Sequence, residues 1–266
     1  MPHALDNFKP KISVVIPAYN EAGRLPATLR DVSSFMEQHV RSYEILVVDD
    51  GSTDQTVKVV RNLANVLPNV RLIESEKNGG KGAAVRRGLR EATGDYRLFM
   101  DADHSTHISE IAKLPFLVER GDVFVSSRYV AGANVEKTQP LLRIIVSRIA
   151  NVVIRTLIPD VRDTQNGFKI YSAAAVNIIE PQLTLDRWAF DVEMLYLAQR
   201  FGFDIVEFPV NWRNSTDSRL HVARDLKNTA REFAMLYRNI LFNRYRIDTA
   251  SVARRRQSTP DQSQIS

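Results

Sequence analysis

Strand-like and helix-like segments alternate over the first hundred residues, and this alternation constrains the fold more than any other feature of the chain. Short runs rich in β-branched residues, typical of buried parallel strands, cover 11–17, 43–48, 70–74 and 95–100. Apolar residues at helical spacing predict helices over 23–39, 54–67 and 81–93, the second capped by Thr53 or Asp54. Strands joined by such helices form right-handed βαβ crossovers, so the sequence predicts an α/β protein whose parallel sheet is covered on both faces.

The composition is that of a globular protein. The chain has 266 residues, of which 44% are hydrophobic and 25% charged, enough to bury the core of one large domain. The absence of cysteine excludes disulfides and thiolate metal sites and favours a reducing, cytoplasmic location. No apolar run reaches the roughly 18 residues of an ordinary membrane-spanning helix. Residues 1–10 lack the apolar stretch of a secretory signal and are expected to be flexible.

The net charge of +5 is unevenly distributed along the chain. Residues 1–136 hold 17 Lys and Arg against 18 Asp and Glu, whereas residues 137–266 hold 19 against 13. The second half therefore favours an anionic partner: nucleic acid, a lipid head group or a phosphorylated substrate. A basic surface that only adds solubility is the alternative.

Polar or glycine-rich clusters follow all four predicted strands, at 17–21, 49–54, 78–82 and 101–103. Ligands of such sheets collect beyond the carboxyl ends of the strands, so the four clusters are expected to build one pocket. Each cluster alone could be a turn or a helix cap. The glycines at Gly79, Gly80 and Gly82 match neither a phosphate-binding Walker loop nor G-x-G-x-x-G, so no dinucleotide cofactor is predicted.

Asp101-Ala102-Asp103 directly follows the fourth strand pattern. Alternate residues of a strand point the same way, so both carboxylates can turn toward one site. Hard anionic oxygens suit Mg²⁺ or Mn²⁺, whose remaining ligands come from water and phosphates. An acidic turn on a solvated loop is the alternative reading.

The combination of VVIPAYNE, ILVVDDGSTDQT, NGGKGAAVRRG and FMDADHST resembles glycosyltransferase family two. The later stretches SSRYV, DTQNGFKIY and RWAFDVEMLYLAQRFGFDIVEFPVNW are similar to its polyprenyl-phosphate branch, the dolichyl-phosphate glucose and mannose synthases. The resemblance implies a nucleotide-sugar-binding, Rossmann-like sheet of glycosyltransferase A type in one catalytic domain, 11–225. Several relatives continue into transmembrane helices, a feature that this sequence lacks.

The resemblance also implies roles for individual residues. Asp103 would be the direct metal ligand with Asp101 beside it, and Ser105 stands where relatives often place a glutamine ligand. His104 or His107 could compensate for that weaker ligand. Residues expected to bind the nucleotide sugar are Pro17, Tyr19, Glu21, Asp49, Asp50, Lys81, Asp101, Ala102 and Asp103. The expected catalytic set is Asp101, Asp103, Arg128, which would face the diphosphate, and Asp191.

Acceptor and phosphate contacts are expected from the second half of the chain. By resemblance they include Asp163, Gln165, Arg213 and Arg219. Residues 141–158 form a basic amphipathic pattern in which Arg143 and Arg148 share a face, as in helices that lie in the head-group plane. A core helix with one solvated basic face is the alternative. A second amphipathic helix is predicted over 226–246, and 247–266 is expected to be a disordered polar tail.

These observations predict a metal-assisted, inverting transfer of a hexose, with glucose from UDP-glucose favoured, onto a polyprenyl or dolichyl monophosphate. Such an acceptor is already anionic, so no strong general base is needed. The enzyme would associate peripherally with the cytoplasmic face of a membrane, with a homodimer as a further use of the amphipathic faces. Alternatives are a GDP-mannose-dependent mannose synthase and a transferase acting on a soluble acceptor or polysaccharide. A non-catalytic nucleotide- or nucleic-acid-binding protein is disfavoured, because no basic stripe with interleaved aromatics supports it.

Overall fold

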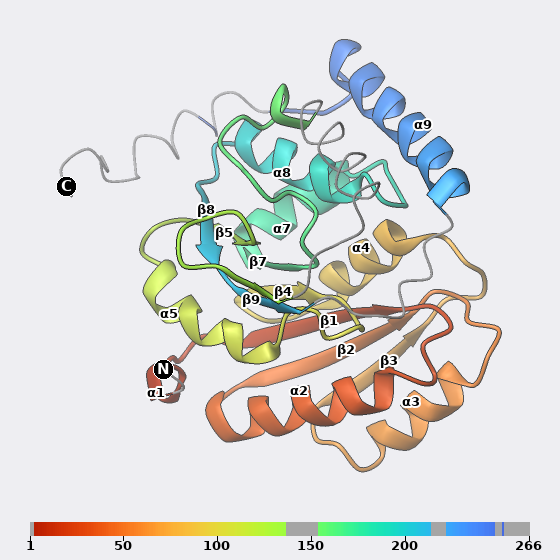
Figure 1. Ribbon diagram of the computed structural model, residues 1–266, viewed down its shortest axis with the longest axis vertical. Coiled ribbons are helices and arrows are strands. Elements are labelled where there is room, and N and C mark those ends of the chain that lie inside the picture. The colour runs from red at the N-terminus through yellow and green to blue at the C-terminus, as the bar shows by residue number, and fades with distance from the viewer. Residues whose placement is uncertain (1–2, 137–153, 214–221, 248–251, 253–266) are drawn as a thin grey trace.

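A seven-stranded mixed sheet forms the centre of the molecule (Figure 1). The computed structural model describes residues 3–136, 154–213, 222–247 and 252. The strand order is β3-β2-β1-β4-β7-β5-β8. The strands are β1 (Ile12–Ala18), β2 (Tyr43–Asp49), β3 (Val70–Glu74), β4 (Tyr96–Met100), β5 (Val123–Ser127), β7 (Phe168–Ser172) and β8 (Ile205–Pro209).

Strands β1 to β4 are mutually parallel where they pair, as the sequence predicts. Strand β7, which lies outside the first hundred residues, runs antiparallel to both β4 and β5 and makes the sheet mixed. The chain enters β7 beside the carboxyl end of β4, where Met100 pairs with Phe168. The 163–167 segment before β7 is thereby delivered to the edge of the sheet where the polar clusters lie.

Helices cover both faces of the sheet (Figure 1). On one face lie α2 (Leu25–His39) and α3 (Thr56–Ala64), and on the other α4 (Lys81–Glu91), α7 (Ala173–Ile179) and α8 (Phe190–Arg200). Adjacent strand residues alternate between two cores, since Val14 and Ile16 belong to one buried cluster and Val15 to the other. The remaining elements are α1 (His3–Asp6), η1 (Ile108–Lys113), α5 (Leu114–Leu117), β6 (Asn134–Glu136), η2 (Glu180–Gln182), β9 (Asn211–Arg213) and α9 (Val222–Leu241).

The predicted strands agree with the structure to within one residue at each end, whereas all three helices are shorter than expected. The first begins at Leu25 rather than at residue 23, and the second spans Thr56–Ala64 rather than 54–67. The third ends at Glu91, because Ala92 already has extended backbone geometry. Asp54 nevertheless acts at the start of α3, where its carboxylate accepts the Thr56 N–H at 2.9 Å.

Within the stretch expected to be flexible over 1–10, residues 3–8 pack against the rest of the protein. Residues 3–6 form α1, and Leu5 is fully buried in the core on the α2 face. Phe8 packs its ring against Tyr96 at a centroid distance of 5.8 Å. Burial of these two side chains outweighs the entropy of a free end. Within the described residues, no helix is long and apolar enough to cross a membrane.

Candidate functional site

The loops after β1 and β2 are joined by hydrogen bonds at the carboxyl edge of the sheet. Asn20, whose φ of 56° is in the left-handed region, accepts the Thr53 N–H at 2.8 Å and the Asp54 N–H at 3.2 Å through Oδ1. Its own N–H donates to Ser52 Oγ at 2.9 Å. The predicted first and second clusters therefore form one structural unit. Pro17 is half-buried at the end of β1, and the Tyr19 ring is 44% exposed in the same unit.

Glu21 lies in this unit but already has a cationic partner. Its carboxylate pairs with the Arg24 guanidinium at 2.6 Å, and its N–H donates to Thr56 Oγ1 at 2.8 Å. A direct bond from Glu21 to a nucleotide base, as the resemblance implies, would compete with Arg24.

Asp49 and Asp50, adjacent in sequence, have different environments. Asp50 accepts the N–H groups of Gly79 and Gly80, each at 2.8 Å, so it fixes the glycine loop before α4. Burial raises the pKa of Asp50 despite these two bonds. Asp49 accepts the Ser52 N–H at 3.0 Å through Oδ2, whereas its Oδ1 is buried without a hydrogen-bond partner among the described residues. A buried acceptor without a donor is costly, and a ligand N–H would satisfy it.

Lys81 and Asp101 form the central ion pair of the site, with 2.7 Å between Nζ and Oδ1. The Lys81 ammonium also lies 5.1 Å from the Phe99 ring centroid and 5.2 Å from that of Trp188. Burial lowers the pKa of Lys81, but the negative charges of Asp101 and Asp191 outweigh it and the pKa is raised. The pKa of Asp101 is also raised, by burial and by the charges of Asp103 and Asp191, despite the opposing effect of Lys81.

Gly167 is required by the position of Asp101. A Cβ on Gly167 would lie 2.0 Å from Asp101 Oδ2, far inside contact distance. The Asp101 N–H donates to the Gly167 carbonyl at 2.9 Å, so backbone and side chain both meet this glycine. Gly167 therefore forms a wall of the aspartate site.

Asp103 and Ser105 lie together beside this pair. Asp103 Oδ1 accepts the Ser105 N–H at 3.0 Å, and the Ser105 carbonyl accepts the Arg213 N–H at 2.9 Å. Among the described residues, no group of three or more His, Asp or Glu could hold a metal ion. Two carboxylates fit a hard divalent cation that takes few protein ligands and completes its shell with water and phosphates. The two aspartates thus suit Mg²⁺ or Mn²⁺. They are too few to surround a metal ion with protein ligands alone.

The two histidines after the aspartates face other partners. His104 has a φ of 61°, and its Nδ1 lies 3.6 Å from an Asp31 carboxylate oxygen. Burial lowers the pKa of His104. His107 Nδ1 accepts the Ser109 N–H at 3.1 Å and so caps η1. Neither contact supports the idea that a histidine replaces the glutamine ligand.

Lys169 is a member of the site that sequence reasoning missed. Its side chain is fully buried, and its Nζ lies 2.9 Å from Asp191 Oδ1 and 2.6 Å from the Asn166 carbonyl oxygen. It also lies 5.8 Å from the Phe99 ring centroid, the ring that Lys81 contacts. The available signal was a lone lysine within the apolar strand 168–172, because a buried lysine needs a carboxylate partner.

Arg128 is held by Asp163, which the resemblance had placed on the acceptor side. The guanidinium Nε and Nη2 donate to the two Asp163 oxygens at 2.8 and 2.9 Å. The guanidinium carbon lies 5.2 Å from the ring centroid of Trp212 and 5.5 Å from that of Tyr129. Asp163 and two aromatic rings thus fix the position of the Arg128 guanidinium. The contact of Trp212 with this group was not predicted from the sequence.

Two of the other predicted acceptor residues, Gln165 and Arg213, lie among the described residues. Gln165 is exposed. Arg213 is exposed and pairs with Glu136 at 2.8 Å across β6 and β9. Arg143, Arg148 and Arg219 lie outside the described residues, as does most of the predicted amphipathic segment.

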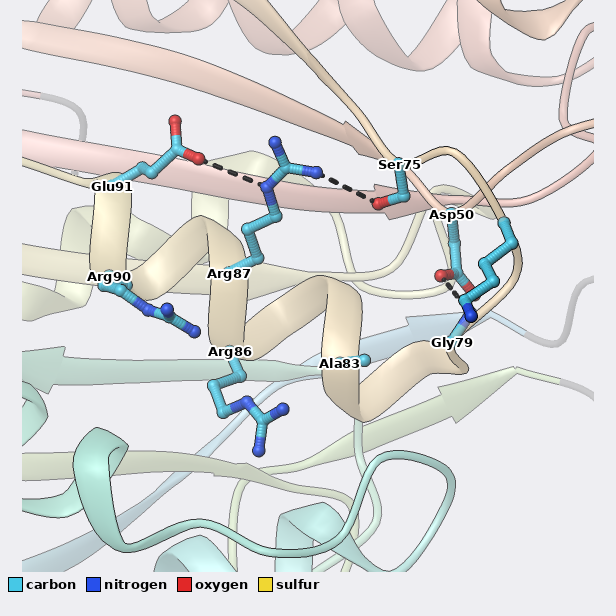
Figure 2. A pocket seen from close by; sticks show the side chains of 9 residues that line it. Asp50, Ser75, Gly79, Ala83, Arg86, Arg87, Arg90 and Glu91 are labelled. Carbon is cyan, nitrogen blue, oxygen red and sulfur yellow. Dashed lines mark hydrogen bonds and ion pairs between the residues drawn. The ribbon is translucent and has the colours of Figure 1, made fainter.

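A cavity of about 290 Å³ runs beside α4 (Figure 2). The residues that line it are Asp50, Ser75, Lys77, Gly79, Ala83, Arg86, Arg87, Arg90 and Glu91. Its arginines look suited to an anion, but each is already paired. Arg87 bonds Glu91 and the Glu74 carbonyl, Arg86 bonds Asp186 and the Leu183 carbonyl, and Arg90 bonds Glu180. These bonds tie α4 to its neighbours and indicate a structural role.

The sequence and the fold both match known glycosyltransferases. Residues 13–178 match the family described as Glycosyl transferase family 2. The Dolichyl-phosphate beta-glucosyltransferase of Dictyostelium discoideum is 36% identical over 79% of this chain and 68% of its own length. The protein of the same description from Homo sapiens is 33% identical over 83% of this chain and 72% of its own length. In fold, the chain is similar to glucosyl-3-phosphoglycerate synthase from Mycobacterium tuberculosis, solved with Mn²⁺, UDP and glucosyl-3-phosphoglycerate. The TM-score is 0.65 at 21% identity, over 86% of this chain and 79% of that one.

Proposed function

The chain belongs to glycosyl transferase family 2 and is a glycosyltransferase, and from this we propose that it moves glucose from UDP-glucose onto the phosphate of a dolichyl or polyprenyl lipid. Glucose as the sugar and a dolichyl or polyprenyl phosphate as the acceptor are proposed because the relatives share one description. Those from slime mould, human and yeast are all dolichyl-phosphate beta-glucosyltransferases, at 33–36% identity.

Asp49 and the 17–21 loop are proposed to receive the nucleotide. The unpartnered Asp49 Oδ1 would accept an N–H from the base or a ribose hydroxyl. Tyr19 offers an exposed ring in the same loop unit, which suits contact with the flat face of a base.

Asp101 and Asp103 are proposed to hold Mg²⁺ or Mn²⁺, with Ser105 nearby as a weaker ligand. The chemistry supplied by the ion is neutralisation of the charge that develops on the leaving diphosphate. The Lys81 ammonium, which contacts Asp101 and two aromatic rings, is proposed to bind the same diphosphate.

Arg128 is proposed to contact a phosphate, because Asp163 accepts from the Nε and Nη2 of the guanidinium and leaves its other edge to a ligand. The opposite edge of the guanidinium can still donate to a phosphate oxygen. A lipid phosphate is anionic near neutral pH, so Asp191 is not needed as a strong base and instead orders the two lysines. In-line attack on the anomeric carbon would invert its configuration and give a β-linked product.

The end of α9 is proposed to rest on the cytoplasmic face of a membrane. Leu241 is 78% exposed and Phe242 68% exposed, and Arg238 and Arg244 are exposed within the same stretch. Exposed apolar side chains flanked by arginines suit the head-group region of an anionic bilayer. A contact between two copies of the chain is the other use of this surface.

Transfer of radiolabel into organic-extractable polyprenyl phosphate tests the proposed function. UDP-glucose and GDP-mannose are supplied in parallel, each with Mn²⁺, Mg²⁺ or EDTA. We expect label from UDP-glucose only, lost with EDTA and in Asp103→Ala, and retained in Asp160→Ala, which removes an exposed aspartate.

Label from GDP-mannose alone would show that the donor is GDP-mannose and not UDP-glucose. Label in a water-soluble product would show that the acceptor is not a lipid. Label transfer that persists in EDTA would contradict the role given to the aspartate pair.

A further inference from the structure

Glu232 of α9 lies outside every predicted site, yet both of its carboxylate oxygens bind backbone beside the site. Oε1 accepts the Arg187 N–H at 2.9 Å, and Oε2 accepts the N–H groups of Trp188 at 2.8 Å and Ala189 at 3.0 Å. The Glu232 side chain is buried, with 8% of the residue exposed. Three successive backbone donors on one buried carboxylate make a strong, charge-assisted contact.

These donors lie in residues 187–189, just before α8, whose N-cap is Ala189. The N-cap side chain makes no capping bond of its own. The first N–H groups of a helix have no partner within it, and a negative charge there is favoured by the helix dipole. Glu232 therefore fixes, from another helix, the backbone that leads into α8, including the N–H of its N-cap residue Ala189.

The residues that Glu232 holds reach Lys81 directly. The Trp188 ring lies 5.2 Å from the Lys81 ammonium, on a side chain that remains 41% exposed. The Asp186 carbonyl accepts the Ala83 N–H at 2.9 Å in the first turn of α4.

The first turn of α4 is packed tightly against this loop. A Cβ on Gly80 would lie 2.5 Å from the Asp186 carbonyl oxygen, and one on Gly82 would lie 2.7 Å from the Phe190 Cβ. There is thus no room for even one extra carbon atom between α4 and residues 186–190. Because the two segments are packed so tightly, a shift of 186–190 is transmitted to α4 and to Lys81.

We propose that Glu232 is a positioning residue for glycosyl transfer, which holds Trp188 against Lys81 and so keeps the Lys81 ammonium beside Asp101. The proposal rests on the proposed function only for its choice of UDP-glucose as donor. Glu232 itself touches neither the aspartates nor Lys81, so it acts through the 187–189 backbone alone.

The first test uses Glu232→Gln in the full chain, because an amide keeps the shape but replaces one acceptor oxygen by a donor that faces backbone N–H groups. With 5-fluorotryptophan incorporated, the two tryptophans give two ¹⁹F resonances, assigned with Trp188→Phe. We expect the Trp188 resonance to shift or broaden while that of Trp212 stays in place. Glu119→Gln, the same change at an exposed glutamate, should leave both resonances unchanged.

The second test is kinetic. In Glu232→Gln, kcat for UDP-glucose is expected to fall about tenfold or more, with a smaller change in KM, because a misplaced charge costs turnover more than binding. In a double-mutant cycle, Glu232→Gln should add little to the loss caused by Trp188→Ala, because both act on Lys81. Glu232→Asp, which keeps the charge with a shorter reach, should lie between wild type and Glu232→Gln.

An unchanged Trp188 resonance in Glu232→Gln, or losses that multiply in the double variant, would overturn the proposal. If Glu232→Gln does not fold, the same two measurements on Glu232→Asp decide. If the wild type uses no UDP-glucose, the proposed function fails, while the ¹⁹F spectrum still decides the positioning role without substrate.

Discussion

The Lys169 ammonium lies 2.9 Å from Asp191 Oδ1, in an ion pair whose lysine is fully buried beneath the site. Lys169 and Lys81 contact the same Phe99 ring, at 5.8 and 5.1 Å from its centroid, and the charge of Asp191 acts on both Lys81 and Asp101. The floor of the site is therefore a set of coupled charges around one aromatic ring, and removing any single member leaves another without compensation.

Lys169→Met is expected to destabilise the protein by about 3–5 kcal/mol, since it leaves a buried carboxylate unpaired. Urea unfolding followed by circular dichroism measures the change. Lys169→Met combined with Asp191→Asn should recover a large part of the loss, because neither charge then remains. A double variant less stable than Lys169→Met would contradict the ion pair as the cause.

Gly167→Ala should abolish transfer while the protein stays folded. Its new methyl group would lie 2.0 Å from Asp101 Oδ2, so the carboxylate has to move away from its position beside Lys81. Binding of Mn²⁺ with UDP, measured by calorimetry, should weaken in parallel. The matched control is Gly23→Ala, because nothing lies within 4 Å of a Cβ there and wild-type behaviour is expected.

Asp163→Asn is expected to lower transfer by about ten- to a hundredfold through a misplaced Arg128, since the amide cannot accept two guanidinium bonds. The loss should appear in titrations of the acceptor rather than of the donor. Arg128→Lys should show a similar or larger loss, because a lysine cannot reproduce the planar fork held between Trp212 and Tyr129. Equal activity of Arg128→Lys and wild type would rule out the bidentate geometry as a requirement.

Glu44 makes the fold sensitive to acid. Burial opposes its ionisation, but bonds from Ser13 Oγ at 2.6 Å and from the Thr93 N–H at 2.7 Å lower its pKa below the usual 4.5. A lowered pKa in the folded state gives stability that is present above pH 4.5 and lost as the pH falls through the folded value.

The free energy of unfolding should therefore decline on acidification more steeply in wild type than in Glu44→Gln. The difference between the two proteins is expected to be about 1–2 kcal/mol near neutral pH and to vanish in strong acid. Parallel curves for the two proteins from pH 7 to pH 3 would show that Glu44 does not contribute.

The parallel half of the fold and the polar edge of its sheet could be predicted, because strand periodicity and the clusters after each strand are local in sequence. The antiparallel direction of β7 could not, since it depends on pairing between Met100 and Phe168, far apart along the chain. Motifs predicted Asp101, Asp103 and Lys81 as site residues, and the structure pairs Lys81 with Asp101. Lys169 left only the signal of a lone lysine in an apolar strand, and Glu232 left none, because a carboxylate that binds backbone from a distant helix has no spacing pattern.

The interpretation of Asp163 shows a second limit. Its motif indicated a place near the acceptor, but only the structure shows that both carboxylate oxygens are engaged by Arg128. The resemblance had given the two residues separate roles, whereas the structure shows one unit of arginine and orienting carboxylate.

The antiparallel strand β7 has a consequence for synthesis of the chain. It lies between β4 and β5 in the sheet, yet it ends at Ser172, well after both have been made. Until that residue leaves the ribosome, β4 presents one edge of unpaired N–H and C=O groups, the kind of edge on which strands of other chains add. Until β7 has been made, the nascent protein is therefore open to strand addition at the β4 edge.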